Sequence, residues 1–247
     1  PDLLELIYRF GADAVRFGIM SSAPAGNDLL FDEASLEQGR NFNNKMWNAL
    51  KLIKMWQERQ QPMLHHHAAA PTFAVQWFRN RLSEVKKEVA QNFQQFKLSE
   101  ALKTIYSLIW DDFCSWYLEW VKPGFNESID AEIYEHTITF YTELLQLLHP
   151  FMPFITEEIY HQLQPRTTDL CMLQYQPFPD EEVEVLQQGK MLKDLITGIR
   201  DVRNKQQIKP KETIRLYFEQ SDANAIQNLT TLLMKQVNAS EVSMNGQ

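Results

Sequence analysis

The sequence predicts a mainly α-helical protein, a helical bundle followed by the start of a small α+β unit. Glycine (8 residues) and proline (11 residues) are sparse in a chain of 247, so turns are few. Apolar residues recur at intervals of three and four along most of the chain, which is the period of one face of an α-helix. Near the end the pattern changes, because residues 214–218 and 241–244 have the composition of short strands.

The helical period defines each segment in turn. Gly11 interrupts the first helical segment, and residues 96–98 interrupt the third, where Ser99 can cap a new helix. Pro150 ends one helix and Pro153 begins the next, since proline in the first helical turn loses no hydrogen bond. Helices are expected over residues 3–20, 33–58, 73–121, 133–148, 153–163, 183–207 and 223–237, with a loop at 21–28, a linker at 60–72 and an extended connection at 165–179.

These elements predict a chain of five parts. A helix and a loop (residues 1–30) form a connector, and a helical bundle follows over residues 31–165. An extended connection (166–182) leads to a long helix (183–209) that completes the bundle, and a small α+β segment occupies residues 210–247. Because the chain opens without methionine and inside an amphipathic pattern, we expect it to be a piece of a longer protein.

Composition excludes several classes of protein. With 44% hydrophobic residues the chain can build a core, which argues against disorder. Two cysteines are too few for a disulfide framework or a four-cysteine zinc site. Neither of the glycine-rich phosphate-binding motifs is present, and the apolar runs are much shorter than the roughly 20 residues of a membrane span.

A few titratable residues carry weak catalytic or metal-binding signals. Neighbouring side chains on a helix point in different directions, whereas a metal site or an acid/base pair needs groups that converge. Cys114 lies among aromatic residues, which favours a buried thiol over a nucleophile. We therefore expect no catalytic residue and no metal ligand. The other candidates are expected to be solvated side chains without a catalytic or metal-binding role: His65, His66, His67, Asp111, Asp112, Glu157 and Glu158.

The segment from Arg40 to Lys51 carries an unusual polar face. Asn41, Asn44 and Asn48 recur at intervals of three and four, and Lys45 accompanies them. Asparagine is a poor helix former, so a face that is merely solvated would be expected to contain glutamate, lysine or glutamine. Amide side chains suit base edges, and basic side chains suit phosphate. The alternative is that Asn41 caps the helix and the other amides bond nearby loops; the spacing leaves both interpretations open.

Two further patterns are compatible with nucleic-acid binding. Residues 190–215 contain eight basic and three acidic side chains, in a chain whose formal net charge is −8. Five aromatic residues follow helical spacing between residues 106 and 120, and they form either a base-stacking platform or, more commonly for this spacing, part of the core. They are Tyr106, Trp110, Phe113, Tyr117 and Trp120.

Three blocks of sequence resemble the valyl-tRNA synthetase family, a branch of the class I aminoacyl-tRNA synthetases, downstream of its catalytic domain. The first comprises residues 11–17, 26–28 and 39–49 (GADAVRF, GND and GRNFNNKMWNA). The second, residues 110–119 with 122–123, is WDDFCSWYLE followed by KP, and the third, residues 149–158, is HPFMPFITEE, which isoleucyl and leucyl relatives share. Residues 199–210 also resemble a late helix of that family, so the likeness covers nearly the whole chain in the family's order.

The resemblance implies an anticodon-binding helical bundle within a longer ligase that attaches valine to tRNA(Val) with ATP and Mg²⁺. Residues 1–30 would connect this bundle to the catalytic domain. The family's two ATP-site signatures are absent from this chain, so it is expected to be inactive alone and to bind no cofactor. The expected partners are the anticodon stem-loop and the catalytic and editing domains of the same parent chain, with no DNA and no membrane. A cytoplasmic monomer is expected.

The resemblance also implies roles for particular residues. It places Lys45 and its neighbours on the helix that faces the anticodon loop. A basic residue is expected near Ala34 and an aromatic one near Leu52, and this sequence departs from the family at both positions. The expected anticodon-binding residues are Arg40, Asn41, Asn44, Lys45, Asn48 and Lys51; Trp47 or Trp56 would stack on a base, and Arg200, Arg203 and Lys205 would bind the tRNA backbone. A protein-interaction domain and a structural spacer are the alternatives.

Overall fold

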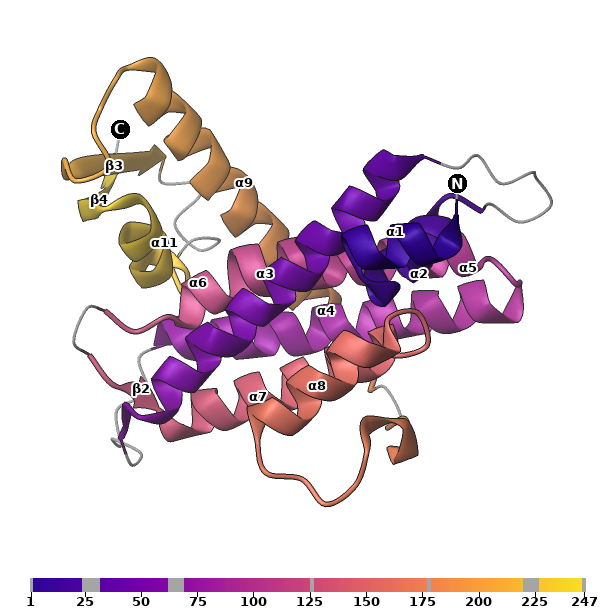
Figure 1. Cartoon of the computed structure of the whole chain (residues 1–247). Helices are drawn as coiled ribbons and strands as arrows, with labels where there is room; N and C mark the ends of the chain where they lie inside the picture. Colours follow the sequence, from indigo (N-terminus) through magenta and orange to yellow (C-terminus); the bar gives the residue numbers. More distant parts are fainter. Residues whose placement is uncertain are drawn as a thin grey trace. The chain divides into compact units, whose positions relative to one another are not determined.

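The chain folds into two compact units, shown in Figure 1 as a computed structural model. The structure describes residues 2–23, 32–61, 69–124, 127–176, 179–219 and 227–245. Unit 1 comprises Pro1–Leu64 and Arg81–Asp180, and unit 2 comprises His65–Asn80 and Glu181–Gln247. The predicted loop at 24–28 and the histidine run at 65–67 lie outside the described residues.

Unit 1 is a bundle of helices with one very short parallel strand pair. Its elements are α1 (Leu3–Phe10), α2 (Ala12–Ser21), α3 (Glu33–Gln57), β1 (Gln60–Gln61), the C-terminal part of α4 (Ala69–Gln94), α5 (Leu98–Ser107), the π-helix η1 (Leu108–Tyr117), α6 (Leu118–Val121), β2 (Ile129–Asp130), α7 (Ala131–Leu148), α8 (Pro153–Leu163) and the 3₁₀ turn η2 (Leu170–Met172). The prediction of a mainly α protein is confirmed.

Helix α3 follows the sequence prediction closely. Asp32 caps it, since its carboxylate accepts a hydrogen bond from the backbone N–H of Ala34 at 2.9 Å. Figure 1 shows α3 running along the bundle beside α8, with α7 on the same side. The phenol of Tyr141, on α7, donates to the backbone carbonyl of Met46 at 2.7 Å and so fixes the middle of α3. The predicted apolar stripe is buried throughout: Phe42, Met46, Ala49, Leu50, Ile53 and Trp56.

Helices α2 and α3 pack unusually closely. A Cβ atom added to Gly39 would lie 2.8 Å from the carbonyl oxygen and 2.9 Å from the Cα atom of Ala14. Gly11, which separates α1 from α2, has a φ of 89°, a conformation that side chains other than hydrogen rarely allow. The predicted interruption at Gly11 is therefore confirmed, and Gly39 explains why α3 can contact the backbone of α2 directly.

Two charged residues of α2 bind the corner between α7 and α8. The carboxylate of Asp13 accepts hydrogen bonds from the backbone N–H groups of Phe154 (3.4 Å) and Ile155 (2.6 Å), and α8 has no side-chain cap of its own. Arg16 donates to the carbonyl oxygens of Phe151 (2.9 Å) and Pro150 (3.0 Å). Burial raises the pKa of Asp13, and the two backbone hydrogen bonds oppose this shift.

The segment from Leu108 to Tyr117 is a π-helix, which the sequence did not predict. Within it, the hydroxyl of Ser115 donates to the backbone carbonyl of Trp110, five residues earlier. A π-helix turns less per residue than an α-helix, so residues with α-helical spacing do not all remain on one face. Phe113, Tyr117 and Trp120 are fully buried, as the core interpretation predicts, whereas Tyr106 and Trp110 are only half-buried.

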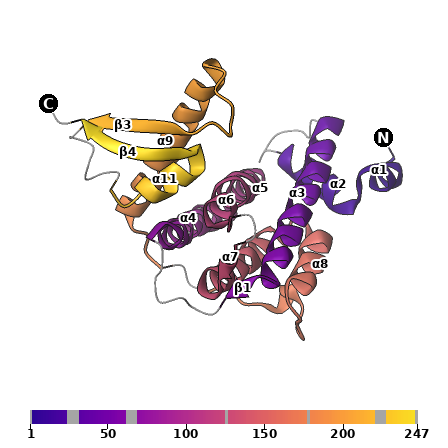
Figure 2. The same cartoon turned by 90° about the vertical axis from the view of Figure 1, so that its left-hand side faces the viewer.

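Unit 2 contains the N-terminal part of α4, then α9 (Val183–Lys205), β3 (Ile214–Glu219), α11 (Thr230–Val237) and β4 (Ala239–Asn245). Strands β3 and β4 pair in parallel, side by side in Figure 2, and α11 connects them. Both predicted strands are confirmed; the predicted helix 223–237 is observed from Thr230, and residues 223–226 lie outside the described part.

We expected residues 183–209 to complete the bundle, whereas α9 groups with unit 2. The spacing of apolar residues does not reveal which neighbouring element covers them.

Three predictions of local detail were wrong. Ser99 does not cap α5: the cap position is Lys97, and the Ser99 hydroxyl donates to the carbonyl of Ser21 at 2.9 Å. Asp112 is not solvated, because it is 4% exposed and accepts a hydrogen bond from Nε of Arg81 at 2.8 Å. The connection at 165–179 is not wholly extended, since it contains the turn η2. Among the described residues, no helix is long and apolar enough to cross a membrane.

Arg203 joins the pieces of unit 2. It is 6% exposed and donates to the carbonyl oxygens of Val237 (3.1 Å), Lys209 (2.6 Å) and Glu212 (2.7 Å). One guanidinium therefore ties α9 to the C-terminal end of α11 and to the loop before β3. A cation at this end of a helix also complements the helix dipole.

Replacement of Gly39 by alanine is expected to lower the free energy of unfolding by about 1–3 kcal/mol, because the new methyl group meets the backbone of Ala14. Gly198→Ala is the matched control, since nothing lies within 4 Å of its added Cβ and alanine favours a helix by about 0.5–1 kcal/mol over glycine. Urea denaturation followed by circular dichroism measures both. Equal effects of the two substitutions would contradict the close approach of α2 and α3.

The raised pKa of Asp13 gives a pH dependence with a defined sign. The folded state binds the proton of the Asp13 carboxyl more tightly than the unfolded state does. The stabilisation that protonated Asp13 gives is therefore complete below pH 3.8, the ordinary pKa of aspartate, and is lost as the pH rises through the pKa of the folded state. The stability of the wild type relative to Asp13→Asn should therefore fall over that range. Denaturation of both proteins between acidic and neutral pH measures this difference, and a constant difference would refute it.

Arg203→Ala is expected to destabilise unit 2 by about 3 kcal/mol, because three carbonyl groups lose a charged donor. Lys205→Ala, two residues away and exposed, should change stability by less than about 0.5 kcal/mol. Hydrogen exchange of the α11 amides provides the readout. Equal protection of α11 in both variants would show that Arg203 does not hold the unit together.

Candidate nucleic-acid interface

The exposed face of α3 carries most of the predicted anticodon-binding residues. Asn41, Asn44, Asn48 and Lys51 are all exposed, on the side of the helix opposite the buried stripe. This arrangement follows from the helical period, because the stripe faces α2, α7, α8 and η1. The face lies on a continuous 25-residue helix whose other side is buried, so its side chains project from a well-supported backbone.

The asparagines of this face have unused hydrogen-bonding groups. Within the part of the chain that the structure describes, the side chains of Asn41, Asn44 and Asn48 bond to no other residue. The cap of α3 is Asp32, so the alternative in which Asn41 caps the helix is wrong. The half-buried Asn43 adds a side-chain oxygen that is buried without a partner among the described residues. The three exposed amides, those of Asn41, Asn44 and Asn48, can donate and accept hydrogen bonds toward a ligand.

Lys45 lies on the flank of this face and is held in place. Its Nζ is 5.2 Å from the centre of the Trp110 ring, within the range of a cation–π interaction. Trp110 in turn stacks on Tyr106, with ring centres 5.5 Å apart and an interplanar angle of 22°. The ammonium group of Lys45 is therefore positioned beside the amide face rather than swinging freely.

Arg40 begins the exposed face and is partly engaged. Its guanidinium donates to Glu37 at 2.7 Å and lies 5.8 Å from the ring centre of Phe10. An exposed ion pair of this kind contributes little to stability, so a phosphate could compete for the guanidinium.

Lys54 is also exposed, one helical turn beyond Lys51. Its three-residue interval from Lys51 was a usable signal that the sequence interpretation missed.

The two tryptophans expected to stack on a base differ in the structure. Trp56 is 4% exposed and belongs to the buried stripe, so it presents no ring face to a ligand and its predicted role is corrected. Trp47 is half-buried at the edge of the polar face and stays a candidate. The sequence interpretation grouped Trp110 with the core, and it missed the contact with Lys45 because the π-helix was not foreseen.

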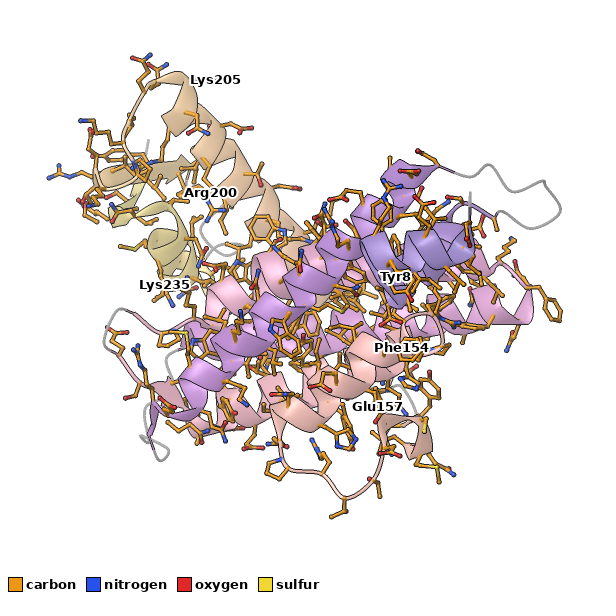
Figure 3. All side chains as sticks on the ribbon, in the orientation of Figure 1. Tyr8, Phe154, Glu157, Arg200, Lys205 and Lys235 are labelled. Carbon is orange, nitrogen blue, oxygen red and sulfur yellow. The ribbon has the colours of Figure 1, made fainter. Side chains whose placement is uncertain are left out.

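The residues expected to bind the tRNA backbone all lie in unit 2, and they differ in their exposure. Arg203 is buried on three carbonyl groups, so its predicted role as a phosphate contact is corrected. Arg200 is exposed and donates to the carbonyl and side-chain oxygens of Gln236, both at 3.2 Å. Lys205 is exposed, and Figure 3 shows it with Arg200 and Lys235 in this unit. Arg200 and Lys235 line a hollow of about 430 Å³ at the end of α11.

Other titratable residues in the described part of the chain serve structural contacts. Burial raises the pKa of the Cys114 thiol to about 12, which confirms that it is not a low-pKa thiol. Asp111 is exposed and accepts a hydrogen bond from Ser107, whereas its neighbour Asp112 forms a partly buried ion pair with Arg81. Glu158 is exposed as predicted, but Glu157 is half-buried and accepts the backbone N–H of Leu170 at 2.7 Å.

Comparison with known proteins assigns the chain to a family. The model described as "Anticodon-binding domain of tRNA ligase" matches residues 75–218. A valine–tRNA ligase of Porphyromonas gingivalis is 47% identical over 223 residues, 87% of this chain and 24% of that protein. One of Bacteroides fragilis is 44% identical over 99% of this chain and 28% of that protein, and one of Clostridium tetani is 33% identical over 98% and 28%. The chain thus spans about a quarter of these relatives, and it belongs to the family of tRNA-ligase anticodon-binding domains.

Proposed function

We propose that this chain recognises the anticodon of tRNA(Val) as part of a longer valine–tRNA ligase. The observation that carries the proposal is the row of three exposed asparagines on α3, whose amides bond to no described residue and lie between basic side chains. Membership of the anticodon-binding family and the similarity to valine–tRNA ligases support the same function. Catalysis, with its ATP and Mg²⁺, would take place in parts of the ligase that this chain does not contain.

The chemistry of the face suits an unstacked anticodon. Valine anticodons share adenine at the middle position and cytosine at the third. An amide can donate to a ring nitrogen of adenine and accept from its amino group, and an amide or a cation can satisfy the acceptors of cytosine. Because the bases of a single-stranded loop can turn outward, Asn44 and Asn48 can reach edges that are hidden in a duplex.

The flanking residues would hold the loop. Lys51, Lys54 and Arg40 are exposed cations at the two ends of the amide row, and we assign them to phosphates. Lys45, placed by the Trp110 ring, would contact a phosphate or a cytosine acceptor. The half-buried Trp47 is the candidate for stacking on a base, and Arg200 and Lys205 are the candidates for backbone contacts from unit 2. We also propose that the protein is a cytoplasmic monomer that binds neither DNA nor a membrane.

Fluorescence anisotropy with labelled anticodon stem-loops tests this function. The wild-type chain should bind the valine loop more tightly than a loop with the middle adenine replaced by guanine, by about 5- to 150-fold, as a single mismatched base costs about 1–3 kcal/mol. Asn44→Ala and Asn48→Ala should reduce this discrimination. Lys51→Ala should weaken binding to both loops and lower the salt dependence by about one phosphate contact.

Gln91→Ala is the matched control, because this exposed amide lies on α4, away from the proposed face. It should leave affinity and discrimination unchanged. Equal binding to both loops would reduce the interaction to nonspecific attraction of phosphate. Absence of binding to either loop at low salt would favour the alternatives, a protein-interaction domain or a structural spacer.

A further inference from the structure

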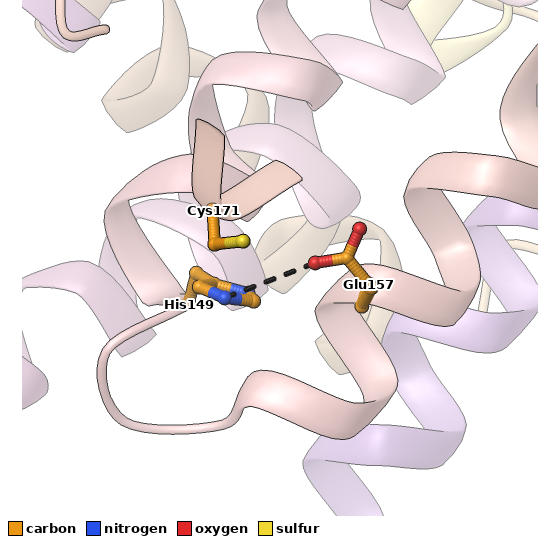
Figure 4. Close-up of side chains that lie close together, drawn as sticks. All are labelled: His149, Glu157 and Cys171. Carbon is orange, nitrogen blue, oxygen red and sulfur yellow. Dashed lines mark ion pairs between the residues drawn. The ribbon is translucent and has the colours of Figure 1, made fainter. Parts of the chain in front are cut away.

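A cluster of metal-ligating side chains lies in unit 1, apart from the α3 face. His149 follows α7, Glu157 lies on α8 and Cys171 lies on the turn η2, and Figure 4 shows the three side chains pointing toward one another. One ligand atom of each lies within 4.8 Å of the other two. The distance from Nε2 of His149 to Oε2 of Glu157 is 3.8 Å. Cys171 is exposed and forms no disulfide.

The hydrogen bonds of His149 leave its Nε2 atom available as a ligand. The hydroxyl of Thr156 donates to the carbonyl of Met152 at 2.8 Å, so it has no second proton to give. With that proton directed at Met152, Nδ1 of His149, 2.8 Å from the same hydroxyl oxygen, is assigned as the donor of that contact. In the neutral imidazole the lone pair is then on Nε2, which faces a carboxylate. A cation between the two would be bound by both.

Glu157 is oriented in a comparable way. Its Oε1 atom accepts the backbone N–H of Leu170 at 2.7 Å and lies 3.1 Å from Nε2 of His161. The same Nε2 atom lies 3.2 Å from Oδ1 of Asp169. These contacts engage one carboxylate oxygen of Glu157 and leave Oε2 directed toward His149. Outer partners of this kind commonly orient the ligands of a metal ion.

We infer that His149, Glu157 and Cys171 bind one zinc ion, with water as the fourth ligand. A thiolate, an imidazole and a carboxylate are the ligands that zinc accepts together, whereas calcium and magnesium prefer oxygen alone. Zinc bond lengths place the atoms of such a ligand set about 3.3–3.6 Å apart in a tetrahedron, so the observed separations, all within 4.8 Å, would contract by up to about 1 Å. The short turn that carries Cys171 can provide this contraction.

The ion would join three separate segments. It would tie the turn Leu170–Met172 to α8 and to the corner after α7. The hydrogen bond from the Leu170 N–H to the Glu157 carboxylate already links the turn to α8. The inference revises the expectation of no metal ligand. No pattern in the sequence signals this site, because the ligands are eight and fourteen residues apart and lie on three different segments.

Titration with Co²⁺, which replaces zinc and is coloured, tests the site. The histidines at positions 65–67 are first replaced by alanine in every protein, so that this run cannot bind the ion. One Co²⁺ per chain should give tetrahedral visible bands and a thiolate-to-cobalt charge-transfer band, and Zn²⁺ should abolish both. The charge-transfer band should disappear in Cys171→Ser, an exposed position that does not affect the core.

Matched variants separate this site from general metal binding. Glu157→Gln should weaken Co²⁺ binding at least 10-fold, and Thr156→Val, which removes the partner of His149 without changing the ligands, should weaken it by about 10- to 100-fold. Cys114→Ser and Glu158→Gln should retain the wild-type spectrum and affinity. A missing charge-transfer band, a band that survives in Cys171→Ser, or equal affinities of Glu157→Gln and Glu158→Gln would overturn the inference.

Discussion

Helix α2 carries an aspartate and an arginine whose hydrogen bonds hold the corner between α7 and α8, and the rest of unit 1 is arranged around this contact. Asp13 supplies acceptors for the first N–H groups of α8, and Arg16 supplies donors for the carbonyls of Pro150 and Phe151. The corner thus has its backbone groups satisfied from a segment more than a hundred residues away in the sequence. A buried carboxylate costs free energy, and these hydrogen bonds offset part of that cost, since burial still raises the pKa of Asp13.

The same helix positions the proposed recognition face. Gly39 lets α3 rest directly on the backbone of α2, and Tyr141 binds the carbonyl of Met46 from the other side. With its inner face fixed by these contacts, α3 presents Asn44 and Asn48 outward from a rigid backbone. Recognition of a flexible RNA loop benefits from such preorganisation, because the protein loses little conformational entropy when it binds.

The sequence predicted this arrangement where local rules are sufficient. The apolar period located α3, and the same period placed Asn41, Asn44 and Asn48 outside the core. The sequence could not predict the π-helix Leu108–Tyr117. Its aromatic residues have the spacing of an α-helix, so no local signal marks the segment as different. The contact between Lys45 and Trp110 therefore escaped prediction.

Long-range contacts account for the other errors. Trp56 and Arg203 have the residue types expected of ligand contacts, yet Trp56 is packed in the core and Arg203 binds three carbonyls, one of them at the end of α11. The cluster at His149 depends on three segments that meet only after folding. Residue type and spacing predict which face a side chain occupies, whereas the partner that engages it depends on the tertiary structure.

The most direct test of anticodon recognition is site-specific photocrosslinking. A benzophenone-bearing amino acid is placed at the position of Asn48, and, in a control protein, at the exposed position of Thr139 on α7. Each is irradiated with tRNA(Val), and the crosslinked nucleotides are mapped. Crosslinks from position 48 confined to the anticodon loop, with none from position 139, are the predicted result. Crosslinks from position 48 to other parts of the tRNA would contradict the proposed recognition face.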